Sequence, residues 1–516
     1  MSYAADPAIK HRMILIVIAI VSSLVMLDNN VVAVALPTIA SSLNADFADV
    51  QWVITAYVLP FAALLIAAGS FGDKVGRRLS AVIGMIIFGL ASLSCGLAIS
   101  PLMLNLSRAA QGVGASLLLT ASMAVINHTF QGAERAKAYA FWGACMGVAI
   151  TCGPIIGGVI SSLFGWTWAF LINVPICTAL VIATLKVVPE SRDPDAKGLD
   201  CPGILTLSSG LFLLIWAVID GNALGWSAPQ VLWRVLGGIT LLVLFVIVEK
   251  RQSRPMVNFE IFRATNFGGA AFAMVGYAAG AQVMIFYLPL YLQNAFGFAP
   301  VIAGISMLPF ALPMFLVPRL GAKLTWSPRS ILSIGLCITA GGNILMALLA
   351  GAGADYYAFA VAMILAGTGA GILNGETAKA VQGAVPANQS GVGSGIASTI
   401  RFTSLLFAVA ALGAVLVSVM LKAFAPVAHD LGLSAVDAIS IAKRFSAGDA
   451  ASALSALPVH QNEAVYDALR VAFDSGFGGA AWVAAAVAIT SLILTRLLMV
   501  DTSIKVSEEA VFVAGE

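Results

Sequence analysis

The chain has 516 residues, of which 60% are apolar and 10% are charged, and its formal net charge is +2. Soluble domains average about 45–50% apolar and about 25% charged residues, so a soluble chain of this composition would have too little polar surface to face water. The balanced charge also provides no strongly basic surface for nucleic acid. Composition therefore excludes a soluble globular protein, a disordered chain and a nucleic-acid-binding protein, and it predicts an all-α polytopic membrane protein.

The apolar residues gather in fourteen stretches, each long enough to cross a bilayer, which takes about 20 residues per helix. In chain order these stretches are 13–36, 52–71, 80–100, 102–126, 138–163, 167–187, 203–221, 232–249, 266–292, 301–320, 329–350, 355–380, 393–422 and 479–499. A twelve-helix arrangement that omits the seventh and eighth stretches has the same parity. The hydropathy of those two stretches is what favours fourteen.

Polar links divide the stretches into three parts. We expect a six-helix bundle over 1–190, a two-helix insert with its flanking links over 191–262, and a second six-helix bundle over 263–516. A basic, Gly-containing turn follows the second helix of each bundle, at 72–78 and 318–329. This faint internal repeat is of the kind that transporters show.

The segment 423–478 is the one long stretch whose composition resembles that of a soluble protein. Ser434 and Asp437 are spaced as a helix N-cap box, and Val465, Leu469 and Ala472 form an apolar helical stripe. We expect two or three short helices here, outside the membrane.

The basic residues indicate the orientation. With the N-terminus inside, twenty of the 27 Lys and Arg residues fall in cytoplasmic segments, five fall outside, and Arg108 and Arg401 fall within apolar stretches. Cytoplasmic loops carry the excess of Lys and Arg in membrane proteins. We therefore expect both termini in the cytoplasm.

The six cysteines and four histidines form no CxxC motif and no Cys/His cluster. We expect no disulfide, no bound metal and no cofactor. The dispersed histidines also provide no catalytic constellation, so we expect no enzymatic activity.

Asp28 lies near the middle of the first apolar stretch, in LDNNVVAVALP (27–37). A carboxylate at a helix centre costs about 2.5–3.5 kcal/mol on insertion scales, so it is functional by default. We expect it to face a cavity and to gain and lose protons. The alternative is a packing residue satisfied by Asn29, Asn30 or a backbone group.

Arg108 lies inside the fourth stretch, and Gln111 and Gly112 share its helix face. Its guanidinium is expected to point to a polar interior, as the electrostatic partner of a proton-carrying acid or an anionic group. The alternative is an arginine whose side chain extends to the outer membrane surface.

The fifth stretch carries WGACMGVAITCGPIIGG (142–158). Its small residues predict close backbone contact with other helices, and Pro154 predicts a kink. The turn GSFGDKVGRR (69–78) has Asp73 among bases, and that carboxylate is expected to accept bonds from a helix N-terminus or to pair with Arg77 or Arg135.

Together these motifs resemble those of the major facilitator superfamily, in particular its fourteen-helix drug:proton antiporter branch. The loop signature between helices 2 and 3 is similar to Gly69…Asp73-Lys74-x-Gly76-Arg77-Arg78, the helix 4 signature to Arg108-x-x-Gln111-Gly112, and the helix 5 signature to Gly143…Gly153-Pro154-x-x-Gly157-Gly158. Shorter matches lie at 27–37, 166–175, 221–226 and 259–267. The resemblance covers about residues 10–420.

The resemblance implies a major facilitator fold and a proton-coupled antiporter that exports amphiphilic drugs or related small organic molecules by alternating access. The residues with implied roles are Asp28, Arg108 and Gln111 in proton coupling, Gly69, Asp73, Gly76 and Arg77 as a conformational latch, and Gly153, Pro154, Gly157 and Gly158 as a seal between bundles. We add Trp142, Gln282, Tyr287 and Tyr291 as candidates for the substrate cavity. The stretches between 266 and 350 contain no acid, which favours monovalent cationic, zwitterionic or neutral substrates over dications.

The resemblance also implies a monomer in the cytoplasmic (inner) membrane of a bacterium, with protons, membrane lipid and a small amphiphilic molecule as partners. Whether a periplasmic adaptor also takes part is left open by the resemblance. Other readings are a dedicated exporter of an endogenous metabolite or antibiotic, a proton symporter for uptake, a membrane-embedded enzyme and a non-transporting scaffold. The Gly-Pro signature at 153–154 favours antiport over symport.

Overall fold

The computed structural model describes residues 7–192, 200–252, 265–321, 326–384, 390–448, 453–454 and 459–500. Several sequence predictions lie outside these ranges. They are most of the link between Pro189 and Pro202, the motif around Phe259, Ile261 and Arg263, and the middle of the basic turn at 318–329.

The described residues are almost entirely helical and contain no strand. The first-half helices and the insert are α1 (Pro7–Leu43), α2 (Phe47–Val75), α3 (Arg77–Gly96), α4 (Pro101–Thr129), α5 (Gly132–Leu163), α6 (Trp168–Leu171), α7 (Asn173–Val187), α8 (Cys201–Leu224) and α9 (Pro229–Arg251). The later helices are α10 (Thr265–Tyr277), a π-helix (Ala278–Gln282), α11 (Met284–Asn294), α12 (Pro300–Ser306), α13 (Leu308–Gly321), α14 (Pro328–Gly351), α15 (Tyr356–Gly383), α16 (Ser390–Asp430), α17 (Ala435–Ser446) and α19 (Val459–Leu498).

Fourteen helical segments among the described residues are long and apolar enough to cross a membrane. The prediction of an all-α fold with fourteen membrane helices is thereby confirmed. In several spans the helix is interrupted: α6 and α7 form one span over Trp168–Val187, and α10, the π-helix and α11 form another over Asn266–Asn294.

The expected outer loop at 423–478 is shorter in the structure. Helix α16 continues to Asp430 and α19 begins at Val459, so much of the loop belongs to two long helices. The stripe of Val465, Leu469 and Ala472 is buried on α19, within the segment Asn462–Leu498 that is long and apolar enough to cross a membrane. Of the expected short helices, α17 is present, and Ser434 accepts the Asp437 amide as its N-cap.

The chain packs as two compact units. The first unit comprises Met1–Met256, Ile285–Leu308 and Val409–Phe477, and the second comprises Val257–Met284, Pro309–Ala408 and Gly478–Glu516. The first unit therefore holds the first-half helices and the insert together with α11, α12 and α17. The division into 1–190, 191–262 and 263–516 stays a prediction.

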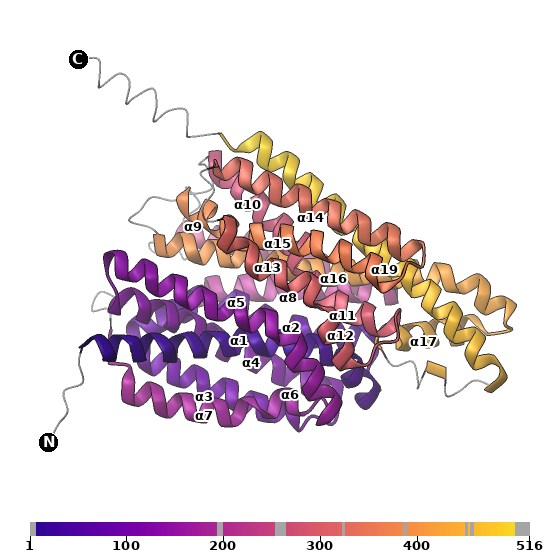
Figure 1. The fold of residues 1–516 in the computed structure, drawn as a ribbon, viewed down its shortest axis with the longest axis horizontal. Coiled ribbons are helices and arrows are strands. Elements are labelled where there is room, and N and C mark those ends of the chain that lie inside the picture. The colour runs from indigo at the N-terminus through magenta and orange to yellow at the C-terminus, as the bar shows by residue number, and fades with distance from the viewer. Residues whose placement is uncertain are drawn as a thin grey trace, which may run out of the picture. The chain divides into compact units, whose positions relative to one another are not determined.

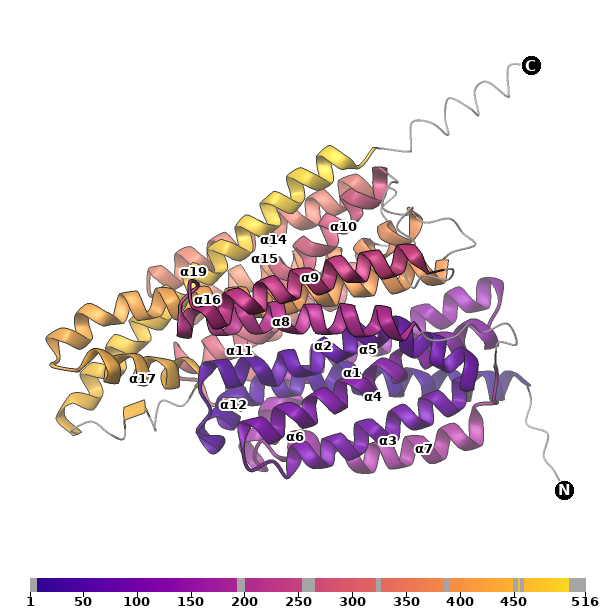
Figure 2. The same ribbon diagram turned by 180° about the vertical axis from the view of Figure 1, so that it is seen from behind.

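In the first unit, α4 packs along both α2 and α3, and α1 packs along α5. Both views of the ribbon show α3 beside α7, at the edge of the indigo-to-purple helices (Figures 1 and 2). The contact between α2 and α4 is so close that a Cβ added at Gly112 would lie 2.2 Å from the carbonyl oxygen of Tyr57. Glycine at 112 is therefore required by the approach of the two backbones.

The insert helices α8 and α9 pack on each other along their length, and α8 also contacts α2 (Figure 2). Arg234 near the start of α9 donates through Nη1 to Asp220 Oδ2 of α8 at 2.7 Å. Its guanidinium also stacks on the ring of Trp216, 3.9 Å from the ring centroid. The charge of Arg234 is thus neutralised within the insert itself.

In the second unit, α14 packs along α15, and α10 also packs against α15. Asn343 of α14 donates through Nδ2 to the carbonyl oxygen of Gly280, inside the π-helix, at 2.7 Å. A π-helix leaves its backbone carbonyls in a wider turn than an α-helix does, and this side chain satisfies one of them.

We expect Gly112→Ala to lower the stability of the fold. The obstructing atom is a backbone oxygen, which cannot rotate away as a flexible side chain would, and overpacking costs about 1–3 kcal/mol. Thermal unfolding of the purified protein in detergent measures the effect. Gly143→Ala is the matched control, because nothing lies within 4 Å of a Cβ there. An unchanged melting temperature for Gly112→Ala would contradict the close α2–α4 contact.

Candidate functional site

A buried ion pair lies at the centre of the first unit. Arg108 of α4 donates through Nη1 to Asp28 Oδ2 of α1 at 2.7 Å, and both side chains are fully buried. Removing two charges from water is costly unless each finds a partner and further hydrogen bonds. The surroundings of this pair provide those bonds.

The carboxylate of Asp28 accepts three hydrogen bonds from three different side chains. Besides Arg108 at Oδ2, its Oδ1 accepts from Gln111 Nε2 at 2.9 Å and from Asn173 Nδ2 at 2.7 Å. These donors come from α4 and α7. The hydrogen bonds that the structure describes for the Asp28 carboxyl group therefore come from other helices, and not from its neighbours Asn29 and Asn30.

The guanidinium of Arg108 is anchored on several sides. Its Nε donates to the carbonyl oxygen of Val53 on α2 at 3.0 Å, and its Nη1 also donates to Gln111 Oε1 at 2.7 Å. Its Cζ lies 4.2 Å from the centroid of the Tyr57 ring and 5.8 Å from that of Phe170. Its head group lies among these interior contacts, so the alternative of a side chain reaching the outer surface does not hold.

Local sequence explains how these side chains meet. Arg108 and Gln111 are three residues apart on α4 and share one face, and Gly112 on the same side lets α2 approach. Asn173 is the first residue of α7, directly after the short helix α6, which aims its amide inward.

Sequence reasoning found Asp28, Arg108 and Gln111 but assigned no role to Ser92, Asn173 or Tyr57. Ser92 of α3 accepts from Gln111 Nε2 at 2.9 Å and from Asn173 Nδ2 at 3.4 Å, so it joins the two amides that hold Asp28. The signal was present in the sequence, because Ser92 and Asn173 are polar residues inside apolar stretches. What was missing was the pairing of α3 and α7 with α4 and α1.

The turn at 69–78 forms the junction of α2 and α3. Gly76 has φ of 128°, a conformation that side-chain-bearing residues rarely adopt. Arg77 donates from Nε and Nη2 to Asp73 Oδ1, at 3.0 and 2.9 Å. Of the partners expected for Asp73, the structure shows Arg77. Nothing lies within 4 Å of a Cβ at Gly69.

The helix N-terminus at this turn is bound by a different carboxylate, Glu190. Its Oε1 accepts the Arg78 amide at 3.1 Å and its Oε2 accepts the Leu79 amide at 3.2 Å, at the positive end of α3. Sequence reasoning missed Glu190, because it lies more than a hundred residues along the chain. The turn is thus held by two carboxylates: Asp73 within it and Glu190 from the segment that follows α7.

The Gly-Pro segment of α5 brings two other helices into backbone contact. On one side, a Cβ at Gly153 would lie 2.5 Å from Asn30 Cβ and one at Gly157 would lie 2.6 Å from the Val31 oxygen, both on α1. On the other side, a Cβ at Gly158 would lie 2.4 Å from the oxygen of Pro300 on α12. Helix α5 is therefore clasped between α1 and α12.

The contact of α5 with α12 is reciprocal. A Cβ at Gly304 of α12 would lie 2.3 Å from the oxygen of Pro154. Pro154 lies inside α5 and has no amide to donate. Such prolines are tolerated in membrane helices because neighbouring groups can satisfy the freed backbone carbonyl. The small residues predicted to pack thus do so, on both faces.

The four cavity candidates belong to two different units. Trp142 donates through Nε1 to Ser22 Oγ at 2.8 Å, and Tyr291 stacks on Phe477 with ring centroids 4.1 Å apart, both within the first unit. Tyr287 donates to the carbonyl oxygen of Val409 there too. Gln282 belongs to the second unit. Their role in substrate binding stays a prediction.

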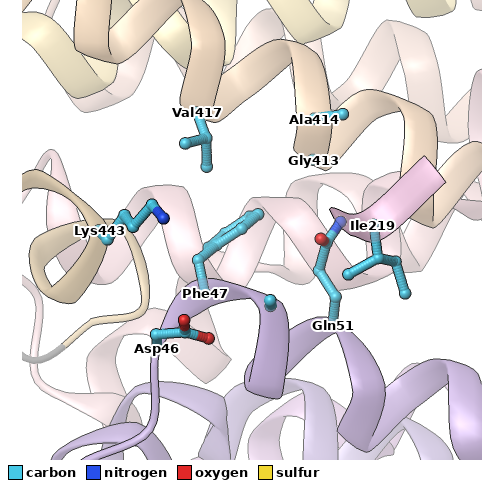
Figure 3. Close-up of a pocket in the computed structure, with 9 residues that line it drawn as sticks. Asp46, Phe47, Gln51, Ile219, Gly413, Ala414, Val417 and Lys443 are labelled. Atoms are coloured by element: carbon cyan, nitrogen blue, oxygen red, sulfur yellow. The ribbon is translucent and has the colours of Figure 1, made fainter. Parts of the chain in front are cut away.

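A pocket opens in the first unit where α2 begins. It is lined by Asp46, Phe47, Ala48 and Gln51 at that end of α2, by Ile219 of α8, by Gly413, Ala414 and Val417 of α16, and by Lys443 of α17. Figure 3 shows Asp46 and Gln51 pointing towards the α16 side of the pocket, with Lys443 entering opposite Ile219. None of the four cavity candidates is among the lining residues.

Gln51 closes one side of this pocket. Its Nε2 donates to the carbonyl oxygen of Val409 at 2.8 Å, and the same oxygen accepts from Tyr287. Glycine at 413 makes the contact possible, because a Cβ there would lie 1.9 Å from Gln51 Nε2. The beginning of α2 is thereby joined to α11 and α16 within one unit.

No group of three or more His, Cys, Asp and Glu side chains suited to a metal occurs among the described residues. The chemistry that the site offers is that of a single carboxylate whose charge is held by an arginine and two amides.

Comparison with known proteins gives consistent matches along the chain. The model of the Major Facilitator Superfamily matches residues 18–409. The multidrug resistance protein Stp of Mycobacterium tuberculosis (strain CDC 1551 / Oshkosh) is 31% identical over 402 residues, which are 76% of this chain and 73% of that protein. The tetracenomycin C resistance and export protein of Streptomyces glaucescens is 30% identical over 487 residues, 92% of this chain and 89% of that protein.

A solved structure shares the fold. It is a bacterial homologue of the human lysosomal transporter Spinster, in an inward-facing and unoccupied conformation, with a TM-score of 0.63 and 16% identity. The match covers 96% of this chain and 98% of that chain. At this identity the likeness concerns the fold alone.

We expect Asp28 and Arg108 to contribute non-additively to the stability of the folded protein. Asp28→Asn or Arg108→Gln alone leaves a buried charge without its partner, which costs about 3–5 kcal/mol. The double variant removes both charges and is expected to regain most of that loss. Thermal unfolding of the four proteins in detergent completes the cycle. Strictly additive losses in the double variant would contradict the pairing.

We expect Glu190→Ala to loosen the start of α3. Loss of a side-chain acceptor at a helix N-terminus costs about 0.5–2 kcal/mol, so hydrogen exchange at the amides of residues 77–80 should quicken several-fold. Asp73→Asn is the control, since the bonds that the structure describes for Asp73 come from the Arg77 side chain and not from an amide of α3. Equal exchange in Glu190→Ala and the parent protein would contradict the capping role.

Proposed function

Because the chain belongs to the Major Facilitator Superfamily, we propose that it is a proton-coupled antiporter that exports amphiphilic drugs or related small organic molecules across the cytoplasmic membrane by alternating access. The observation that carries this proposal is the buried pair of Asp28 and Arg108. The relatives named for multidrug resistance and for export of tetracenomycin C support it.

The hydrogen bonds around Asp28 link its protonation to the contact between α1 and α4. As a carboxylate it accepts bonds from Arg108, Gln111 and Asn173. A proton on Asp28 would remove the charge that balances Arg108 and would turn one acceptor into a donor facing other donors. Neutral Asp28 therefore favours separation of α1 from α4, whereas the charged form holds the two helices together.

Movement of α1 would be transmitted through α5. Gly153 and Gly157 place α5 in direct contact with α1, and Gly158 places it in direct contact with α12. Packed backbones cannot slide by small amounts without a clash, so a shift at α1 is expected to alter the α5–α12 contact. In this proposal the Gly-Pro motif couples the proton site to the seal between the two halves of the sequence.

The expected orientation of the chain places each of these contacts on one side of the membrane. With both termini in the cytoplasm, the α5–α12 contact and the pocket at Gln51 face outward, and the turn at Gly69, Asp73, Gly76 and Arg77 faces inward. The hydrogen bonds of Gln51 and Tyr287 to Val409 then help to close the outer side. The Asp73–Arg77 pair would latch the turn in one conformation.

The driving force is sufficient for export. A proton moving through a membrane potential of 100 mV releases about 2.3 kcal/mol, which sustains roughly a fifty-fold gradient of a neutral solute. One carboxylate is enough for this exchange. The substrate candidates Trp142, Gln282, Tyr287 and Tyr291 complete the proposal as cavity residues.

A second candidate is a dedicated exporter of an endogenous metabolite or antibiotic. The relative that exports tetracenomycin C, which matches 92% of this chain, favours it. Both candidates use the same proton mechanism and differ in the breadth of substrates. A panel of chemically unrelated dyes and antibiotics separates them, because a dedicated exporter would transport one scaffold.

We further propose a monomer in a bacterial inner membrane, with protons, lipid and the small organic substrate as its partners and with no enzymatic step. Its family and its structural neighbours are transporters. A periplasmic adaptor is not required by this mechanism.

We expect Asp28→Asn to lose gradient-driven transport in liposomes with an imposed pH gradient, by at least about tenfold, because amide protonation does not change in this range. Exchange of labelled for unlabelled substrate without a gradient should persist, since it needs no proton step. Asp355→Asn is the control: Asp355 caps α15 in the second unit, and asparagine caps equally well. Unchanged gradient-driven transport in Asp28→Asn would overturn the assignment of the proton acceptor.

A further inference from the structure

A second intramembrane arginine, Arg401, lies in the second unit. It belongs to the span Ile396–Asp430 and points into a group of polar side chains. Its Nε donates to Gln282 Oε1 at 2.8 Å, and its Nη2 donates to Tyr277 Oη at 3.1 Å. Its Cζ also lies 4.9 Å from the centroid of the Tyr277 ring.

The head group of Arg401 is drawn into the interior and not to the membrane surface. Tyr277 and Gln282 lie near the middle of the span Asn266–Asn294, and they are 0% and 9% exposed. An arginine that only relieves its charge at a lipid surface would extend towards the nearest helix ends. Arg401 instead bonds two buried side chains at mid-span.

A π-helix makes this arrangement possible. Tyr277 and Gln282 are five residues apart, which in a regular α-helix would turn their side chains about 140° away from each other. The π-helix Ala278–Gln282 lies between them, and its wider turn brings both to the same guanidinium. Such π-turns occur frequently at functional sites.

Among the described residues, no carboxylate forms an ion pair with Arg401. Its two partners are a neutral amide and a neutral phenol, and the phenol of Tyr277 donates onward to Asn374 Oδ1 at 2.8 Å. The acid of α15, Glu376, pairs with Lys379 at 2.6 Å. Within the described part of the chain, no carboxylate pairs with Arg401 and its Nη1 has no hydrogen-bond partner.

Arg401 differs from Arg108 and Arg234, which also lie in membrane helices but have acidic partners. Arg108 pairs with Asp28 and Arg234 pairs with Asp220, each at 2.7 Å. Unlike these two arginines, Arg401 has an amide and a phenol, both neutral, as its side-chain partners. A cation held in this way, with donors to spare, is suited to an anionic oxygen from outside the chain.

We propose that Arg401, oriented by Gln282 and Tyr277, forms a subsite that binds an anionic group of the transported molecule, a carboxylate being the best match. This rests on the proposed transport function and extends its substrate class from cationic, zwitterionic and neutral molecules to anionic amphiphiles. Gln282 then contributes by aiming the guanidinium, and need not contact the substrate.

The test compares two probes that differ by one charge, naphthalene-2-carboxylate and naphthalene-2-carboxamide. Their equilibrium binding to the full-length protein in lipid nanodiscs is measured by dialysis, with binding to empty nanodiscs subtracted. A hydrogen-bonded charge pair is expected to make the carboxylate bind about 10- to 100-fold more tightly than the carboxamide.

Two variants should remove this preference, and two further variants serve as controls. Arg401→Gln should abolish it by removing the charge. Gln282→Glu should abolish it differently, because an internal carboxylate would then occupy the guanidinium while the contact between α16 and the π-helix is kept. Arg401→Lys should retain part of the preference, and Arg234→Gln, which removes an equivalent charge from the insert, should retain all of it.

The outcomes are distinct from those for the proposed function. A parent protein with no preference for the carboxylate, or a preference that survives both Arg401→Gln and Gln282→Glu, overturns the anionic subsite. The same probes are then followed in liposomes under a pH gradient. Charge-dependent binding would leave the subsite standing, whereas an absence of gradient-driven flux for these probes and for every compound of the dye and antibiotic panel would overturn the proton-coupled exporter.

Discussion

A charge inside a membrane protein must be balanced by the protein, because the lipid provides neither water nor counter-ions. The pair of Asp28 and Arg108 meets this requirement with contributions from five helices: the carboxylate from α1, the guanidinium and an amide from α4, a carbonyl oxygen from α2, a hydroxyl from α3 and a second amide from α7. Few arrangements of these helices satisfy all of those bonds at once. The ion pair therefore fixes the packing of the first unit as much as the packing buries the ion pair.

Close helix packing is the second requirement, and small residues meet it. Between soluble helices, apolar side chains are driven together by water, but in lipid the gain comes from close contact itself. In this chain the small residues appear where a polar bond would otherwise fall short. Gly112 lets α2 bring the Val53 oxygen to Arg108, and Gly413 lets α16 bring the Val409 oxygen to Gln51. At both places the glycine allows the close helix approach that the polar contact requires.

Much of this organisation could be predicted from the sequence, and the remainder depends on contacts between distant segments. Hydropathy identified fourteen spans because length and apolarity are local properties. Asp28, Arg108 and Gln111 could be found because charge in an apolar stretch is conspicuous. Asn173 and Glu190 were missed, since one amide or carboxylate gains its role only from the helix it meets. The length of α19 was underestimated because its polar residues near 462–474 resemble a loop, although its apolar stripe continues the span. The π-helix at 278–282 has no evident sequence signal.

The ion pair of the insert has a consequence for how such a chain could be assembled over time. Arg234 is neutralised by Asp220 and covered by Trp216, so the charge of this arginine is balanced within the pair of α8 and α9. Its helices also pack mainly on each other. Because the insert contributes two membrane helices, its presence preserves the sidedness of every helix that follows it in the chain. The insert can thus diverge in sequence under rules of its own, while the residues around Asp28 cannot.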